Sequence, residues 1–196
     1  MDMAKENHNE KLAAIQAQLS RYSERGKKDL LITPGNYGEG VLADKLNLNL
    51  ENMVKCGGFI GKTIDMAAEL GINSLLLAGH LGRMIQIVNG IQDVDERQDD
   101  DSVEVLADCV LLAGGDAGVS QRLLYCNTMD EAVEALWMTA FLQPAVAQLM
   151  RRAGRVLADH AGARIQVEAL AFSNRYGMLG KTPGAEELIM LHRKLL

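Results

Sequence analysis

Short apolar runs alternate with glycine-containing turns and with amphipathic segments over the first half of the chain. Three runs have the length and hydrophobicity of buried strands, and they cover residues 29–33, 52–56 and 74–78. Segments with helical spacing of apolar residues follow the turns, at 38–46, 59–70 and 81–88. Strand, glycine turn and helix in repetition predict βαβ units and a parallel sheet with helices on its faces.

The second half of the chain is rich in predicted helices. Apolar residues recur at helical spacing over 103–112, 118–125, 130–141 and 144–160. A late strand is expected at 164–172 and a closing helix at 185–195, while Thr128-x-x-Glu131 matches a capping box. The predicted fold is therefore α/β: a Rossmann-like parallel sheet of successive βα units, followed by a helix-rich second half.

The N-terminal segment carries a narrow apolar stripe of Leu12, Ile15 and Leu19. Such a stripe predicts an exposed or lid-like helix that Gly26 stops. We therefore expect an N-terminal helix over 1–26 and a single α/β domain over 27–196. The acidic stretch 92–102 is interpreted as a solvated linker, since it lacks the spacing and central glycine of a calcium loop.

Composition narrows the function classes. The 196 residues carry a formal charge of −6, and only 4% are aromatic, which argues against duplex binding and against stacking of single-stranded nucleic acid. No apolar run approaches the roughly 18 residues of a membrane span, and the N-terminus is polar. Three cysteines without CxxC spacing indicate a reduced, cytoplasmic setting.

The turn after the first strand is a candidate ligand site. Gly35, Asn36 and Gly38 lie where a parallel strand gives way to a helix, and ligands of open α/β sheets bind at the carboxyl ends of strands. Glycines let backbone N–H groups approach a ligand, and a helix N-terminus favours negative charge. A tight turn that binds nothing explains the spacing equally well, and no complete GxGxxG signals a dinucleotide.

A second candidate cluster follows the clearest strand and contains Gly79, His80, Gly82 and Arg83. A histidine at a strand end can donate a hydrogen bond to a ligand or act as an acid or base near neutral pH. An arginine there can clamp a carboxylate. A turn histidine bonded to backbone and a solvated arginine remain the alternatives. No HExxH or GxSxG occurs, so neither a protein-bound metal nor a nucleophile is predicted.

Three blocks of sequence resemble the CbiD family, the cobalt-precorrin-5B C1-methyltransferases of anaerobic cobalamin biosynthesis. They are residues 32–39 (ITPGNYGE), 54–61 with Asp65 following, and 76–83 (LLAGHLGR). The resemblance is to the C-terminal half of the family, over about 28–195. The family usually has Ser-Asn where this chain has Gly57-Gly58. Its N-terminal Thr-Thr-Gly-Thr-Cys-type motif does not occur here, so we expect the N-terminal half to be absent.

The resemblance implies methyl transfer from S-adenosylmethionine to C1 of a cobalt-corrinoid precursor. Such a displacement needs alignment and exclusion of water more than a strong base. The glycines, Asn36 and His80 are then expected to hold S-adenosylmethionine. Arg83 and the basic run of Arg151, Arg152 and Arg155 are candidate clamps for substrate carboxylates. Two alternatives stay open: a non-catalytic ligand-binding relative, and a subunit that needs a separate N-terminal half or forms a homo-oligomer.

Overall fold

A five-stranded sheet forms the centre of the molecule in a computed structural model, which describes residues 3–35, 38–91 and 103–194. Its strands are β1 (Asp29–Thr33), β2 (Met53–Lys55), β3 (Ser74–His80), β4 (Gln166–Ser173) and β5 (Gly177–Lys181). Their order is β2-β1-β3-β4-β5. The first four are mutually parallel and β5 is antiparallel to β4. The predicted α/β class with a parallel sheet and a helix-rich second half is confirmed.

Strand alternation divides the core between the two faces of the sheet. Leu30 and Ile32 belong to the larger cluster of buried residues, whereas Leu31 between them belongs to the smaller one. Leu75 and Leu76 divide in the same way. Because side chains point alternately to opposite faces, a continuous apolar run needs cover on both sides.

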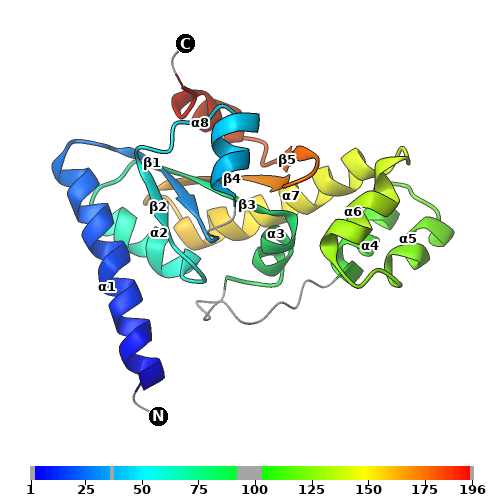
Figure 1. Ribbon diagram of the computed structural model, residues 1–196, viewed down its shortest axis with the longest axis horizontal. Coiled ribbons are helices and arrows are strands. Elements are labelled where there is room, and N and C mark those ends of the chain that lie inside the picture. The colour runs from blue at the N-terminus through cyan, green and yellow to red at the C-terminus, as the bar shows by residue number, and fades with distance from the viewer. Residues whose placement is uncertain (1–2, 36–37, 92–102, 195–196) are drawn as a thin grey trace.

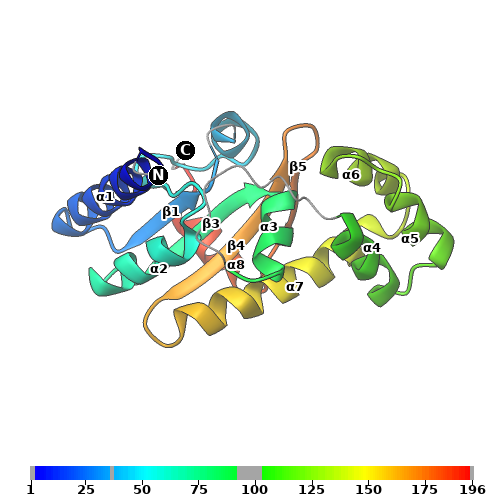
Figure 2. The same cartoon turned by 90° about the horizontal axis from the view of Figure 1, so that it is seen from below.

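Helices supply that cover. The larger face carries α2 (Ile60–Glu69), α3 (Leu81–Val88) and α7 (Leu142–Ala161), and the smaller face carries the π-helical turn η1 (Val41–Lys45) and α8 (Ala185–Leu191). Figure 1 shows α8 on the opposite side of the sheet from α2 and α7. A helical lobe of α4 (Val103–Leu112), α5 (Ala117–Leu123) and α6 (Met129–Trp137) lies at the far end of the molecule from α1 in both views (Figures 1 and 2).

Helix α1 (Met3–Glu24) belongs to the core, which corrects the prediction of an exposed or lid-like helix. Ile15, Leu19 and Tyr22 are buried in the same cluster as the strands. The Tyr22 hydroxyl donates to the Glu51 carbonyl oxygen at 3.0 Å, and the Ser23 hydroxyl donates to the Leu70 carbonyl oxygen at 2.9 Å. The narrow stripe on this helix is thus a packing face against α2 and β2.

Other boundaries differ from the predictions in ways that tertiary contacts explain. The sequence gives no sign of β5, whose Gly-Met-Leu-Gly-Lys lacks the β-branched residues typical of strands. The expected short helix at 38–46 is present over 39–45, with π-helical geometry at η1, whereas the closing helix ends earlier than predicted, at Leu191. The predicted capping Thr128 is confirmed, since its hydroxyl accepts a hydrogen bond from the Glu131 N–H at 3.2 Å. The acidic linker 92–102 lies outside the described residues.

Candidate functional site

The sheet has a topological switch point between β1 and β3. The chain leaves β1 through η1 on the smaller face to reach β2, then returns through α2 on the larger face to β3 on the other side of β1. In open α/β sheets, the crevice at such a reversal, outside the carboxyl ends of the strands, is where ligands bind. Both glycine turns predicted from the sequence leave the sheet here, after Thr33 and at His80.

Gly79 brings the two turns together. A Cβ atom at this position would lie 3.4 Å from Pro34 Cγ and 3.0 Å from Met84 Cε, so only a residue without a side chain allows this approach without displacing a neighbour. Gly79 is buried within β3. It therefore serves the contact between turn and strand.

Phe172 links His80 to the first turn from a third strand. Its ring centroid lies 4.6 Å from that of the His80 imidazole. A Cβ on Gly38 would overlap the Phe172 ring, so the backbone of Gly38 lies directly against this aromatic side chain. Nothing near Phe172 in the sequence marks it as part of the site, because β4 pairs with β3 across more than eighty residues of chain.

His80 is both the last residue of β3 and the residue that precedes α3. No loop separates the strand from the helix, and the His80 side chain makes no capping hydrogen bond. The first N–H groups of a helix lack intrahelical partners and carry partial positive charge. The half-buried imidazole and the start of α3 are therefore presented together at the carboxyl edge.

A cavity of about 170 Å³, here named the His80 cavity, opens at this edge. From the sheet side it is lined by His80, Leu81, Gly82, Phe172 and Ser173. The helical lobe supplies the opposite wall through the start of α6, at Thr128, Met129, Asp130 and Val133. The sequence predicts no ligand role for these lobe residues, because no local pattern connects them to the strands.

A second cavity of about 250 Å³, here named the α1 cavity, lies at the carboxyl ends of β1 and β2. Helix α1 contributes Lys11, Ala14, Ile15 and Gln18, and the strand turns contribute Pro34, Gly35 and residues 55–59. Gly35 thus opens onto a different cavity from His80 and Gly82. The two predicted turns meet at one edge of the sheet, but the first lines the α1 cavity and the second lines the His80 cavity.

The predicted clamps lie outside both cavities. Arg83 Nη1 donates to Gln86 Oε1 at 2.8 Å along α3. Arg151 and Arg155 are exposed in the middle of α7, and Arg152 Nη1 lies 3.8 Å from Cys109 Sγ. Asn36, the remaining predicted ligand contact, lies outside the described residues.

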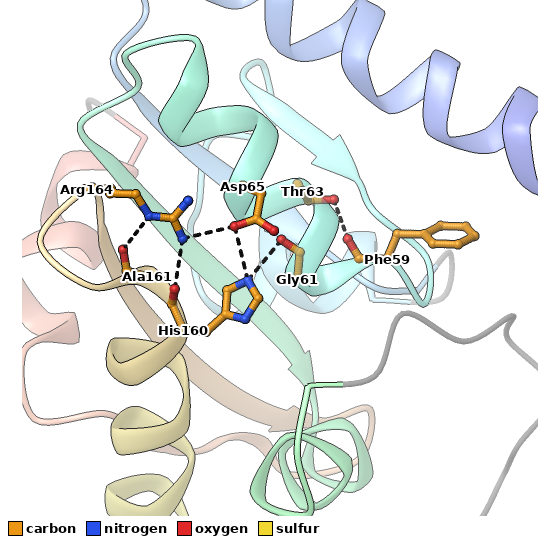
Figure 3. A network of polar contacts seen from close by, with 7 residues as sticks. All are labelled: Phe59, Gly61, Thr63, Asp65, His160, Ala161 and Arg164. Atoms are coloured by element: carbon orange, nitrogen blue, oxygen red, sulfur yellow. Dashed lines mark hydrogen bonds and ion pairs between the residues drawn. The ribbon is translucent and has the colours of Figure 1, made fainter.

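Asp65, which follows one of the family-like blocks, has a packing role. Its Oδ1 atom lies 3.0 Å from Arg164 Nη2 and 3.4 Å from His160 Nε2 (Figure 3). The same imidazole nitrogen is 3.3 Å from the Gly61 carbonyl oxygen, so these contacts join α2 to the end of α7. The network therefore holds the two crossover helices of the larger face against each other.

Cys109 is a buried titratable residue in the larger of the two core clusters. Burial raises the pKa of the Cys109 thiol, although the nearby Arg152 opposes this. A raised pKa leaves the thiol protonated and unreactive. Within residues 3–35, 38–91 and 103–194, no three His, Cys, Asp or Glu side chains gather in a way that could hold a metal ion. In the same residues, no helix has the length and hydrophobicity needed to cross a bilayer.

The fold and the edge geometry define a mixed α/β protein whose candidate ligand site lies at the switch point of a mostly parallel sheet. The family model of the CbiD C-terminal domain matches residues 94–183. Together with the relatives that follow, this match confirms that the chain resembles the C-terminal half of the CbiD family.

Curated relatives named cobalt-precorrin-5B C(1)-methyltransferase match most of the chain. The protein of Clostridioides difficile (strain 630) is 28% identical over 178 residues, which are 90% of this chain and 44% of the relative. That of Listeria monocytogenes (strain EGD-e) is 23% identical over 177 residues, 89% of this chain and 48% of the relative. The chain thus spans about half the length of these relatives. No solved structure matches it.

Proposed function

We propose that this chain binds S-adenosylmethionine in the His80 cavity, at the carboxyl edge of the sheet, and takes part in methylating C1 of a cobalt-corrinoid precursor, cobalt-precorrin-5B. A role in cobalamin biosynthesis is supported by the family match and by the printed names of the relatives. The observation that carries the proposed site is the meeting of the two glycine turns at the switch point, where Pro34 and Gly79 come together.

The polar groups that line the His80 cavity are of the types that would bind the charged groups of S-adenosylmethionine. The N–H groups at the start of α3, including that of Gly82, suit a carboxylate, and the Asp130 carboxylate on the opposite wall suits a cationic group. S-adenosylmethionine supplies a methyl group on a cationic sulfur. His80 would give one directional hydrogen bond, with Phe172 holding the imidazole in place.

The chain's contribution to the reaction is positioning. Gly35, Gly38 and Gly79 set the backbone of the turns, so that donor and acceptor can be aligned. The start of α6 in the helical lobe forms the opposite wall of the His80 cavity, where it would limit the access of water to a bound ligand. Arg83 would bind a substrate carboxylate in exchange for its bond to Gln86.

Two alternatives follow from specific observations. Gly57-Gly58 stands where the family usually has Ser-Asn and lines the α1 cavity, which favours a non-catalytic relative that kept its ligand site. The second alternative is that the chain acts as a subunit together with an N-terminal half like that of the two relatives, of whose length it covers 44–48%. Release of S-adenosylhomocysteine from a mixture with the cobalt precursor separates an active chain from both.

Calorimetric titration with S-adenosylmethionine tests the proposed site. His80→Ala should weaken binding by about 1–3 kcal/mol, because its ligand partner is left buried and unpaired. Gly79→Val should abolish binding, but its side chain would also meet Pro34 and Met84, so circular dichroism and the smaller Gly79→Ala are needed beside it. Tyr125→Ala, at an 86% exposed position, is the control and should bind as the wild type does.

Absence of wild-type binding to both S-adenosylmethionine and a corrinoid precursor would refute the methyltransferase proposal for this chain. Unchanged binding in both His80→Ala and Gly79→Ala would place the site elsewhere and leave His80 as a turn residue.

A further inference from the structure

We propose that the α1 cavity is a second binding site, which takes a carboxylate side chain of a tetrapyrrole ligand while S-adenosylmethionine occupies the His80 cavity. This inference rests on the proposed function, because that function supplies a ligand with many carboxylates. The His80 cavity and the α1 cavity, which share one edge of the sheet, would then bind two ligands of different charge.

The two cavities differ in the charge of their walls. Lys11 and Lys55 line the α1 cavity, and none of its described lining residues is acidic, although the chain as a whole has a net charge of −6. In the His80 cavity the charged lining residue is Asp130, and the described lining there contains neither lysine nor arginine. An anionic group therefore suits the first cavity, and a sulfonium or ammonium group suits the second.

Lys55 already binds a carboxylate, that of Glu39. Its Nζ atom lies 2.5 Å from Glu39 Oε1, and the two side chains are 48% and 43% exposed. A carboxylate thus fits beside this ammonium group at the rim. A ligand carboxylate would replace Glu39 there, and Lys11 would approach it from α1.

The rest of the lining has the composition of a small-molecule site. Ile15, Cys56 and Phe59 are buried side chains and give the cavity an apolar part, while the Gln18 amide adds a polar group. Mostly apolar walls with a few placed polar groups are typical of ligand pockets. The Pro34-Gly35 turn forms part of the wall, and Pro34 also approaches Gly79, next to His80. A ligand anchored in the α1 cavity is consequently held at the same sheet edge as the His80 cavity.

The α1 wall is fixed in place. The His8 ring meets the Phe59 ring edge-on, with centroids 4.7 Å apart, and Leu19 is fully buried further along the helix. Tyr22 and Ser23 add hydrogen bonds to the ends of neighbouring elements. The helix is therefore a preformed wall of the cavity, and little ordering is needed when a ligand binds.

Titration with uroporphyrin, a porphyrin whose side chains all end in carboxylates, tests the assignment by fluorescence. Lys11→Glu and Lys55→Glu should each weaken uroporphyrin binding by about three- to tenfold, since each replaces an attraction by a repulsion. Glu39→Gln should strengthen it, because the competing carboxylate is removed. Lys27→Glu makes the same change of charge at an exposed position beyond α1 and should have little effect.

S-adenosylmethionine titration of the same variants separates this inference from the proposed function. Unchanged affinity in Lys11→Glu and Lys55→Glu is expected. Loss of S-adenosylmethionine binding in these variants, with uroporphyrin unaffected, would overturn the assignment, as would an equal loss of uroporphyrin binding in Lys27→Glu. If the wild type binds uroporphyrin in the expected pattern but not S-adenosylmethionine, the proposed function fails and the carboxylate site stands.

Discussion

At the scale of single residues, neighbouring side chains of β3 serve different cores. Leu75 and Leu77 pack under α2, α3 and α7, whereas Leu76 between them faces η1 and α8. All three are fully buried. The run of leucines that looks uniform in the sequence therefore supports two layers of helices, and the loss of one side chain affects only one of them.

Leu76→Ala should lower the free energy of unfolding by about 2–5 kcal/mol, because it removes buried methyl groups and leaves a cavity on the smaller face. Urea denaturation measures the change. Leu112→Ala is the matched control at a 62% exposed leucine and should change stability by less than about 0.5 kcal/mol. A loss below about 1 kcal/mol for Leu76→Ala would show that the smaller face collapses around the missing side chain.

His192 is a buried titratable residue after α8. Among the described residues, its Nε2 atom is a buried polar side-chain atom without a hydrogen-bond partner. Burial lowers the pKa of its imidazole below the ordinary 6.5, with partial opposition from Asp29 and the Leu30 backbone. The folded chain therefore binds protons less readily here than the unfolded chain does.

Stability should fall as the pH drops below about 6.5, because the unfolded chain then takes up a proton that folded His192 resists. Above that pH both states hold a neutral imidazole and the effect vanishes. The free energy of unfolding measured at pH 5.5 and pH 8 should differ less in His192→Phe than in the wild type. Equal differences in the two proteins would show that His192 is not the group responsible.

At the scale of elements, α1 has the sequence of a surface helix and the contacts of a core helix. Its apolar stripe is only about one side chain wide, but Ile15, Leu19 and Tyr22 all enter the main cluster. The same helix supplies one wall of the α1 cavity. Unfolding of α1 by itself would therefore expose the core and open the proposed carboxylate site.

Leu19→Ala should lower the stability of the whole chain by about 2–5 kcal/mol in one cooperative transition. Urea denaturation followed by circular dichroism and by tryptophan fluorescence gives the comparison, since Trp137 lies in the distant lobe. Coincident shifts in both signals are expected. A change confined to a separate early transition would mean that α1 detaches on its own.

The start of α6 both caps its own helix and lines the His80 cavity. Thr128 caps the helix through the Glu131 N–H, and the Glu131 carboxylate accepts from the Asn127 N–H at 2.7 Å. Both Thr128 and Asp130 also line the His80 cavity. The cap therefore fixes the lobe's contribution to the site.

Thr128→Ala should cost about 1 kcal/mol of stability, the usual loss of an N-cap side chain. Thr128→Ser keeps the hydroxyl and should stay within a few tenths of a kcal/mol of the wild type. Chemical denaturation of both variants distinguishes the cap from the general effect of replacing an exposed residue. A similar loss in Thr128→Ser would contradict the capping role.

At the scale of the whole molecule, the His80 cavity and the α1 cavity share one edge of the sheet but have walls of opposite charge. The lobe and α1 lie at opposite ends of the molecule, and each covers its own part of that edge (Figures 1 and 2). A donor with a cationic sulfur and an acceptor with carboxylates can thus be held by separate walls. This division gives the proposed methyl transfer an electrostatic basis that neither cavity provides alone.

If the proposed site binds S-adenosylmethionine, the ligand should stabilise the folded chain as a whole. At a concentration about one hundred times Kd, the gain is about 2.7 kcal/mol, which raises Tm. Thermal unfolding with and without ligand measures it, and His80→Ala should show a smaller rise at the same concentration. The same rise with adenosine or methionine alone would argue against recognition of the intact molecule.

The sequence by itself determined the parallel strands, their order of appearance and the polar turns at their carboxyl ends. Apolar runs bounded by glycine indicate buried elements, so β1, β3 and α2 could be predicted from residues close together in the chain. The pairing of Gly79 with the turn at Pro34 also followed, because parallel strands present their carboxyl ends at one edge. The resemblance to the CbiD family depended on these same turns.

Only the tertiary structure decided which residues complete the site. Phe172 against His80, the lobe wall at Asp130 and the α1 wall at Lys11 all join segments that are distant in sequence. Their residue types are ordinary for a core, a helix start and a helix surface, so no local pattern distinguishes them. The strand β5 and the burial of α1 were hidden for the same reason: their stability comes from long-range packing rather than from local propensity.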